Sequence, residues 1–293
     1  MNRTYYSSKE MVFEKGFLDD CVDATYIIHL EGNGRLDHIN QQLELYHPTK
    51  TVILVFNKGY KKTGKKLPQN TPTYDLIDVF INVFKDAREK KYNNILILED
   101  DFIFSEKILD SKNTGSIIKF IHSRNQKRES FLYVLGCLPW FQIPITIPMD
   151  FDFFTRKVLV RTGTHACIYS KELRDKVLAF DQSSISDWDV YTNWYFTNYM
   201  FYEPLCYQLF PETENKKYWL YLFGISELFN LLLKFFEMDK KAEPGFSFFY
   251  WFSLLFFIFL FFLFCFYFFW AYFFLKSWSW KNNNIDIKIE KLL

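Results

Sequence analysis

The sequence predicts an α/β protein with a mostly parallel central sheet and one C-terminal transmembrane helix. Between residues 24 and 98, short apolar runs alternate with segments of helical periodicity, which is the βαβ pattern of a parallel sheet. Residues 246–275 form a run of 30 residues with 15 phenylalanines and no Asp, Glu, Lys or Arg. Because about 20 apolar residues suffice to cross a bilayer, this run predicts one membrane span.

The individual elements follow from local apolar patterns. Continuous apolar runs predict buried strands at residues 24–30, 51–56 and 95–98, and helical spacing predicts helices at 36–46 and 73–91. Further along, we expect strands at 131–135, 157–160 and 165–169, a Pro-rich loop at 138–149, and a helix at 170–179 with Ser170 at its cap.

Composition limits the class of protein. The 293 residues carry 35 Lys+Arg against 34 Asp+Glu, a net charge of +1, so we expect no nucleic-acid partner. Hydrophobic residues make up 49% of the chain, which excludes general disorder. Five cysteines without a CxxC pair favour reduced, buried thiols over a zinc site.

These patterns divide the chain into five parts. We expect an N-terminal extension at 1–20, one α/β domain at 21–218, an amphipathic connector at 219–245, the transmembrane helix at 246–275 and a short polar tail at 276–293.

The apolar run indicates how the protein meets the membrane. The first 20 residues hold no apolar run typical of a signal peptide. A single span near the C-terminus then predicts a tail anchor, with the domain in the cytosol. At about 1.5 Å per residue the run is about 45 Å long, more than a hydrocarbon core of about 30 Å. The span is therefore expected to tilt, or to place its ends in the interface.

The acidic triplet Glu99-Asp100-Asp101 is the strongest candidate site. It directly follows the apolar strand 95–98, and ligands of α/β sheets bind beyond the carboxyl ends of strands. Three adjacent acids repel one another unless a cation is present, and oxygen ligands favour Mg²⁺ or Mn²⁺. Glu99 and Asp101 share one side of an extended chain. The alternative is a solvated acidic turn.

Several segments resemble family 25 glycosyltransferases, the group of lipooligosaccharide and collagen galactosyltransferases. The sequence Leu-Glu-Asp-Asp at 98–101 after an apolar strand resembles the LEDD form of their DxD motif. Other similar segments follow in the family's order: residues 26–30 with Arg35, 132–136, 162–170, 187–189 and 205–211. The similarity spans about residues 24–214.

The resemblance implies a GT-A-like single nucleotide-binding domain that moves a sugar from a UDP-sugar donor to a hydroxyl of a glycan, lipid or protein, with Mn²⁺ or Mg²⁺. It implies that Asp101 binds the metal directly, that Glu99 binds it through water or binds the donor ribose, and that Asp100 supports the loop. Arg35 is expected to contact the nucleotide or its phosphates, or else to be a surface arginine after a glycine turn. His165 completes the metal shell or is structural.

A second acidic segment supplies the candidate catalytic residues Asp187 and Asp189. An inverting transferase needs a carboxylate to take the proton of the acceptor hydroxyl, and Trp188 between them offers a face for a sugar ring. If the segment is extended, both carboxylates lie on one side. The alternative is a helix N-terminus, because Ser184, Ser186 and Asp187 are good caps.

Basic residues and competing activities leave further alternatives. We expect one of two roles for the basic residues Arg156, Lys157 and Arg161: they bind a phosphate, or they form a solvated strand edge. A metal-dependent nucleotidyltransferase or phosphohydrolase would also use clustered carboxylates, although the chain has no Gly-rich P-loop. A catalytically degenerate, membrane-anchored binding protein is the non-enzyme alternative.

Overall fold

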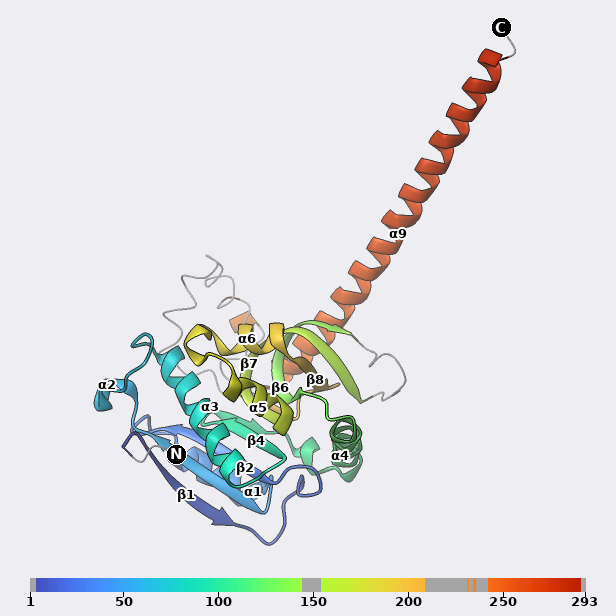
Figure 1. The fold of residues 1–293 in the computed structure, drawn as a ribbon. Coiled ribbons are helices and arrows are strands. Elements are labelled where there is room, and N and C mark those ends of the chain that lie inside the picture. Colours follow the sequence, from blue (N-terminus) through green and yellow to red (C-terminus); the bar gives the residue numbers. More distant parts are fainter. Residues whose placement is uncertain (1–3, 144–153, 209–230, 232–233, 236–241, 291–293) are drawn as a thin grey trace.

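A seven-stranded sheet with helices on both faces forms the domain, and a long helix projects from it (Figure 1). This computed structural model describes residues 4–143, 154–208, 231, 234–235 and 242–290. For residues 242–244 and 279–290 it describes the backbone alone. The predicted α/β class and the apolar C-terminal helix are confirmed. The predicted connector 219–245 and the second half of the Pro-rich loop lie almost entirely outside the described residues.

The N-terminal half of the sheet is the parallel part. Strands β3 (Thr51–Asn57), β2 (Ala24–Leu30) and β4 (Asn94–Glu99) are parallel neighbours, as the apolar runs predict. Strand β1 (Tyr6–Val12) pairs antiparallel with β3 at the edge of the sheet. Residues 6–12 therefore belong to the sheet and not to a separate N-terminal extension.

The C-terminal half makes the sheet mixed and not mostly parallel, which corrects the prediction. Strand β7 (Thr155–Ser170) is antiparallel to β4, to β6 (Phe131–Ile143) and to β8 (Thr197–Phe201). Among the described strands of this half, β6 and β8 form the one parallel pair. Only the 11 residues 144–154 separate β6 from β7, fewer than the dozen or more that a parallel crossover needs, so the chain returns antiparallel.

The short strands expected in this half merge into longer ones. Residues 157–160 and 165–169 both belong to β7, and β6 runs past the expected end at 135 into the Pro-rich segment. Register shifts bend β6 near Gly136, where a Cβ would lie 1.7 Å from the carbonyl oxygen of Cys206. Only glycine permits this close backbone approach.

Helices cover both faces of the sheet. Helices α3 (Pro72–Glu89), α5 (Lys171–Ala179) and α6 (Trp188–Tyr195) pack on one face, and α1 (Leu36–Leu45) and α4 (Ser111–Gln126) on the other. Strand β4 serves both apolar cores, because alternate side chains point to opposite faces. Smaller elements are α2 (Tyr60–Thr63), β5 (Phe102–Phe104), η1 (Glu106–Leu109), η2 (Gln182–Ser184) and β9 (Cys206–Gln208).

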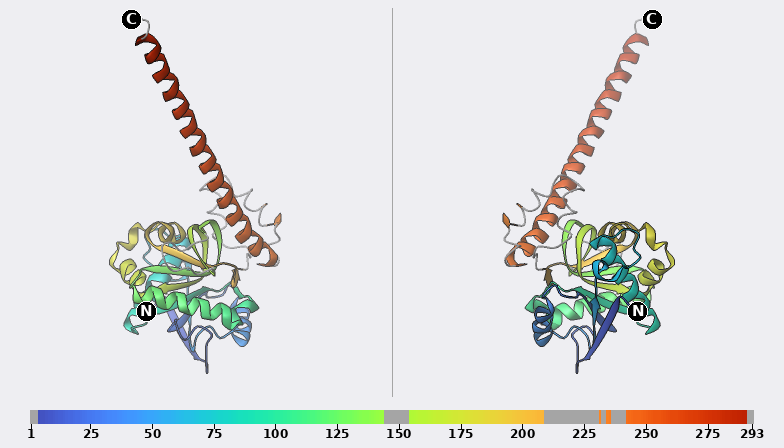
Figure 2. Two further views of the ribbon diagram at one scale, coloured as in Figure 1. Left: turned by 90° about the vertical axis from the view of Figure 1, so that its right-hand side faces the viewer. Right: turned by 90° about the vertical axis from the view of Figure 1, so that its left-hand side faces the viewer.

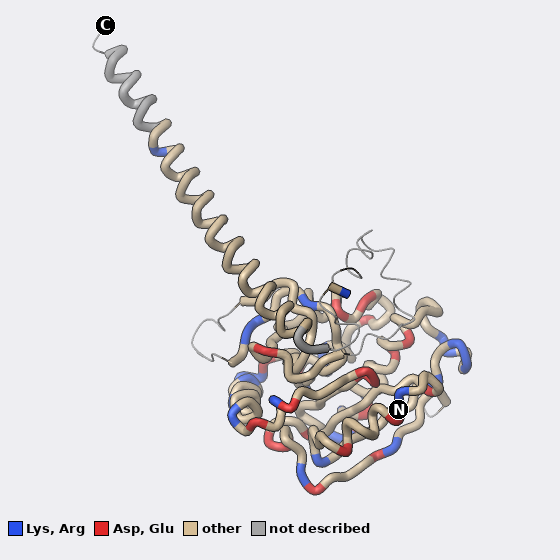
Figure 3. Tube along the Cα trace, turned by 180° about the vertical axis from the view of Figure 1, so that it is seen from behind, with Lys and Arg blue, Asp and Glu red and all other residues tan. Residues whose placement is uncertain are grey.

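Helix α9 (Ala242–Glu290) packs against the domain with its first turns and then projects away from it (Figures 1 and 2). Phe246, Phe249 and Tyr250 are buried in its first turns, in contact with residues of β6 and β9. The following turns are exposed, and no charged residue interrupts them before Lys276 (Figure 3). Residues 245–278 are long and apolar enough to cross a membrane.

Candidate functional site

The acidic triplet lies where the parallel strands end. Strand β4 ends at Glu99, and Asp100 and Asp101 form the turn that leads into β5. The neighbouring strand β2 runs parallel to β4 and ends at Leu30 on the same edge. The predicted position of these acids at the carboxyl end of a buried strand is therefore confirmed.

Asp100 is bound from four sides. Its Oδ2 accepts hydrogen bonds from His29 Nδ1 at 3.1 Å, Leu30 N at 3.0 Å and Asn33 Nδ2 at 2.6 Å. Its Oδ1 accepts from Arg35 at 2.6 Å. Burial alone would raise the pKa of Asp100, but the hydrogen bond from His29 and the charge of Arg35 outweigh it, so the pKa is lowered. Asp100 therefore ties the end of β2 and the turn after it to the acidic motif.

Arg35 lies between this network and the last acid. Its guanidinium is 3.4 Å from Asp101 Oδ2 as well as bonded to Asp100. Arg35 also occupies the N-cap position of α1, without a side-chain capping bond, after a turn in which Gly32 and Gly34 have positive φ. The alternative of a free surface arginine is thereby corrected, and contact with a nucleotide stays a prediction.

Glu99 and Asp101 are two carboxyl groups that disfavour each other's ionisation, the first half-buried and the second buried. Thr164 donates a hydrogen bond to Glu99 Oε1 at 2.7 Å, and Gln208 donates to Asp101 Oδ2 at 3.1 Å. Asp101 Oδ1 is buried and has no hydrogen-bond partner in the part of the chain that the structure describes. Burial and then the charge of Asp101 raise the pKa of Glu99 to about 8. Burial raises the pKa of Asp101 to about 6, although Arg35 lowers it.

This pair fits a divalent cation in part. The open Oδ1 of Asp101 and the unfavourable proximity of two carboxylates are what a bound cation would relieve. Among the residues described, no three His, Cys, Asp or Glu side chains gather in a group that could hold a metal. The protein thus offers two carboxylates here, and the other ligands would come from water or a bound phosphate.

His165 does not join these carboxylates, in contrast to the prediction. Its Nε2 donates to the carbonyl oxygen of Cys206 at 3.2 Å, and its ring lies edge-on to Phe246. Side chains alternate along β7, so Thr164 reaches Glu99 while His165 points to the opposite face. Burial lowers the pKa of His165 to about 4, which keeps the ring neutral at pH 7.

The segment with Asp187 and Asp189 is a helix start and not an extended strand. Asp187 caps α6 and accepts a hydrogen bond from the backbone amide of Val190 at 2.9 Å. Trp188 is 3% exposed and stacks on Phe80, so it is a core residue and offers no platform for a sugar. The alternation that was expected to put both acids on one side is therefore absent.

Asp189 faces the acidic edge of the sheet. It accepts from Arg161 Nη1 at 3.2 Å and from the backbone amide of Gly163 at 3.0 Å. Its charge contributes to raising the pKa of Glu99, after burial and the nearer Asp101. Burial raises the pKa of Asp189 itself, although Arg161 lowers it. The structure thus brings Glu99, Asp101 and Asp189 to one region.

Arg161 is neither a phosphate cradle nor part of a solvated edge. It is fully buried, and besides Asp189 it donates to Asn198, the Gly163 carbonyl oxygen and Thr192. Nothing in the sequence marked this network, because its members are scattered over β7, α6 and β8. A buried guanidinium needs several acceptors, but only the fold shows that Arg161 is buried.

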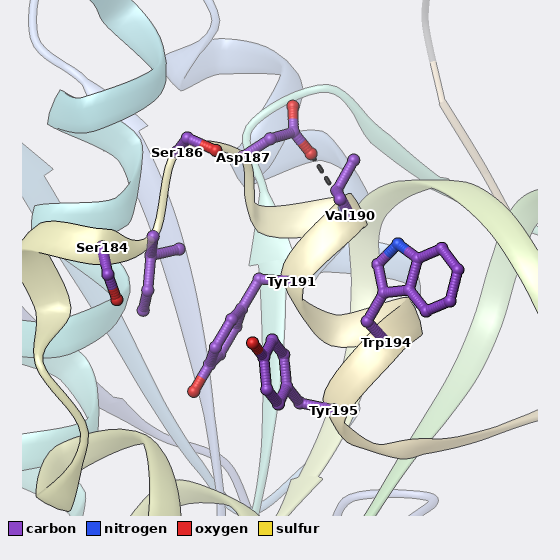
Figure 4. Close-up of a pocket in the computed structure, with 8 residues that line it drawn as sticks. Ser184, Ser186, Asp187, Val190, Tyr191, Trp194 and Tyr195 are labelled. Atoms are coloured by element: carbon purple, nitrogen blue, oxygen red, sulfur yellow. Dashed lines mark hydrogen bonds between the residues drawn. The ribbon is translucent and has the colours of Figure 1, made fainter.

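A hollow of about 460 Å³ lies beside the start of α6 (Figure 4). Asp187, Trp194 and two tyrosines of α6 line it together with residues 184–186 and Val190. Glu99 and Asp101 do not line it. The hollow is therefore separate from the acidic pair.

Comparisons with known proteins add little to this geometry. No protein-family model matches the chain, and no curated protein matches it. Among solved structures, the crystal structure of A197 from STIV is 14% identical and covers 65% of this chain and 86% of its own, with a TM-score of 0.35.

Proposed function

We propose that the protein is a membrane-anchored, metal-dependent glycosyltransferase of GT-A fold that moves a sugar from a UDP-sugar to a hydroxyl of a glycan, lipid or protein. The observation that carries this proposal is the pair of half-buried Glu99 and buried Asp101 at the carboxyl end of β4, with one carboxylate oxygen of Asp101 unpartnered among the described residues. A single α/β domain with this pair at the edge of its parallel strands supports a nucleotide-binding function.

Asp101 and Glu99 would hold the cation. Bound there, Mn²⁺ or Mg²⁺ would neutralise the diphosphate that leaves when the sugar departs. The guanidinium of Arg35, fixed by Asp100, adds a second positive charge at the same edge for phosphate oxygens. The network around Asp100 thus supports a donor site by holding this cationic group in place.

Asp189 is the proposed base for the acceptor hydroxyl. Burial raises its pKa, and Arg161 and the Gly163 amide fix both of its oxygens. A carboxylate held in this way can take a proton without changing its rotamer. Asp187, whose Oδ1 caps α6, is better placed to orient the helix than to react.

Helix α9 supports the membrane part of the proposal. Its apolar, uncharged surface after residue 254 has the length and composition of a span. Cytosolic placement of the domain stays a prediction. Protease added to intact microsomes should digest the domain, whereas a protected domain would reverse the orientation.

The proposed reaction is tested by incubating the full-length protein in detergent with sugar nucleotides and Mn²⁺, with detection of hydrolysis by mass spectrometry. We expect Mn²⁺-dependent release of UDP from one or a few UDP-sugars. Turnover of nucleoside triphosphates alone would favour the nucleotidyltransferase or phosphohydrolase alternative. If the protein neither binds nor turns over any nucleotide, the result would favour a catalytically degenerate binding protein.

A further inference from the structure

The part of the apolar helix that is not docked on the domain matches the thickness of a bilayer's hydrocarbon core. Phe246, Phe249, Tyr250 and Leu254 are buried, although Phe248, Trp251 and Phe252 on the outer side of the same turns are exposed. Leu254 is the last buried residue that the structure describes in α9, so the stretch without docked side chains starts at Leu255. The 21 residues 255–275 measure about 31 Å at about 1.5 Å per residue, close to a hydrocarbon core of about 30 Å. The bilayer surface would therefore meet the helix directly where it leaves the domain.

The strands beside this exit point carry exposed apolar side chains. Phe141 on β6 is part-exposed, and its ring centroid lies 6.4 Å from that of Phe256 on α9. Val160 on β7 is the register partner of Phe141 and is also exposed. An apolar strip thus continues from the first exposed turn of α9 across the two strands.

The outer side of α6 carries a second exposed apolar surface. Trp188, Tyr191 and Thr192 turn inward, while Val190 and Trp194, one turn apart, are exposed. Trp194 is 81% exposed. Both views of the fold place α6 and the upper part of the β6–β7 pair at the end of the domain from which α9 projects, with β1 at the far end (Figures 1 and 2).

We propose that this end of the domain, formed by Phe141, Val160, Val190 and Trp194, rests in the interfacial zone of the bilayer. The proposal depends on the membrane anchor proposed above and adds a fixed orientation of the domain to it. The docked first turns of α9 hold the domain at the membrane surface, and tryptophan is favoured at that depth. Helix α6, which carries the proposed base Asp189 in its first turn, would then lie next to lipid. A membrane-embedded acceptor would reach the site from that side.

The lipid partner follows from the side chains. The four residues are apolar or aromatic and none is basic, so the contact does not depend on anionic headgroups. We therefore propose that phosphatidylcholine, which is zwitterionic and has no net charge, is a sufficient surface.

The test uses the full-length protein with Cys265→Ala, because the other four cysteines are buried. Single cysteines placed by Trp194→Cys, Val190→Cys or Val160→Cys carry an environment-sensitive fluorophore in phosphatidylcholine vesicles that contain nitroxide lipids. Val12→Cys on β1 is the water-exposed control, and Phe262→Cys marks the span. For side chains about 5–10 Å into the interface, we expect quenching roughly twofold or more above the Val12 control.

Each outcome decides the matter. Quenching at 194, 190 and 160 together with 262 supports the proposed orientation. Quenching at 262 alone leaves the anchor in place and overturns the contact of the domain with lipid. Quenching at none of these positions overturns the anchor and this inference with it. Addition of 1 M salt should leave the quenching unchanged, and its loss in salt would contradict an apolar contact.

Discussion

The hydroxyl oxygen of Tyr250, on the apolar helix α9, accepts a hydrogen bond from the backbone amide of Cys137 on strand β6 at 3.2 Å. The backbone carbonyl oxygen of Tyr250 accepts another from Gln142 at 2.7 Å. The start of α9 is thus built into the sheet by directional bonds as well as by apolar contact. A helix that looks like a free membrane anchor therefore also contributes to the fold of the domain.

We predict that Tyr250→Ala destabilises the domain by about 3–5 kcal/mol, because it removes a buried aromatic ring and leaves a cavity. Phe262→Ala is the matched control on the same helix, since Phe262 is 66% exposed and belongs to none of the apolar clusters formed by the described residues. Its effect on domain unfolding should be within about 0.5 kcal/mol. Urea unfolding of the full-length variants in detergent measures both. Equal stabilities would show that α9 is only an anchor.

The two tryptophans of α6 should behave in opposite ways. Trp188 stacks on Phe80 and donates a hydrogen bond to Tyr169, so Trp188→Ala should cost about 3–5 kcal/mol. Trp194 is exposed, and Trp194→Ala should change stability by less than about 0.5 kcal/mol. Thermal unfolding of both variants checks this prediction. A stable Trp188→Ala protein with weakened sugar binding would restore Trp188 as an acceptor platform.

The apolar patterns of the sequence correctly predicted those strands and helices whose positions depend on local sequence alone. Strand β4 and helix α3 are found within a few residues of their expected bounds, because their side chains face a core on known periods. The mixed half of the sheet was missed, since strand direction depends on which distant strand lies adjacent. The docking of Tyr250 was missed for a similar reason: a phenylalanine-rich run has no local signal that separates lipid contact from protein contact.

The site shows the same division. Local sequence was enough to place Glu99 and Asp101 at the end of β4. The partners of Asp100 were not predicted as a group, because His29 and Asn33 meet it only when β2 and β4 pair in parallel. His165 was assigned to the metal from its residue type, and the alternation along β7 turned it away.

The neutral, buried state of His165 predicts a pH dependence of stability. Its pKa falls from 6.5 to about 4 in the fold, so between these values the unfolded chain binds a proton that the folded chain does not. Stability should therefore be lost as pH falls from about 6.5 to about 4, by at most about 3 kcal/mol from this residue. His165→Gln should reduce that loss, whereas His122→Gln, on an exposed histidine, should not.

Urea unfolding at pH 7 and pH 5 measures this difference. Mn²⁺ binding is measured on the same samples, because a structural histidine and a metal ligand give different results. His165→Gln should retain Mn²⁺ binding in the presence of UDP. A variant with wild-type pH dependence that no longer binds Mn²⁺ would return His165 to the metal shell.

Titration calorimetry of Mn²⁺–UDP with the wild type and with Asp101→Asn tests the proposed site most directly. Removing one anionic ligand should abolish measurable binding and lower donor hydrolysis by roughly a hundredfold or more. The fold should persist, because like-charge repulsion with Glu99 is relieved. Asp37→Asn, on an exposed acid of α1, should bind as the wild type does. Wild-type affinity in Asp101→Asn would contradict a metal–nucleotide site at the end of β4.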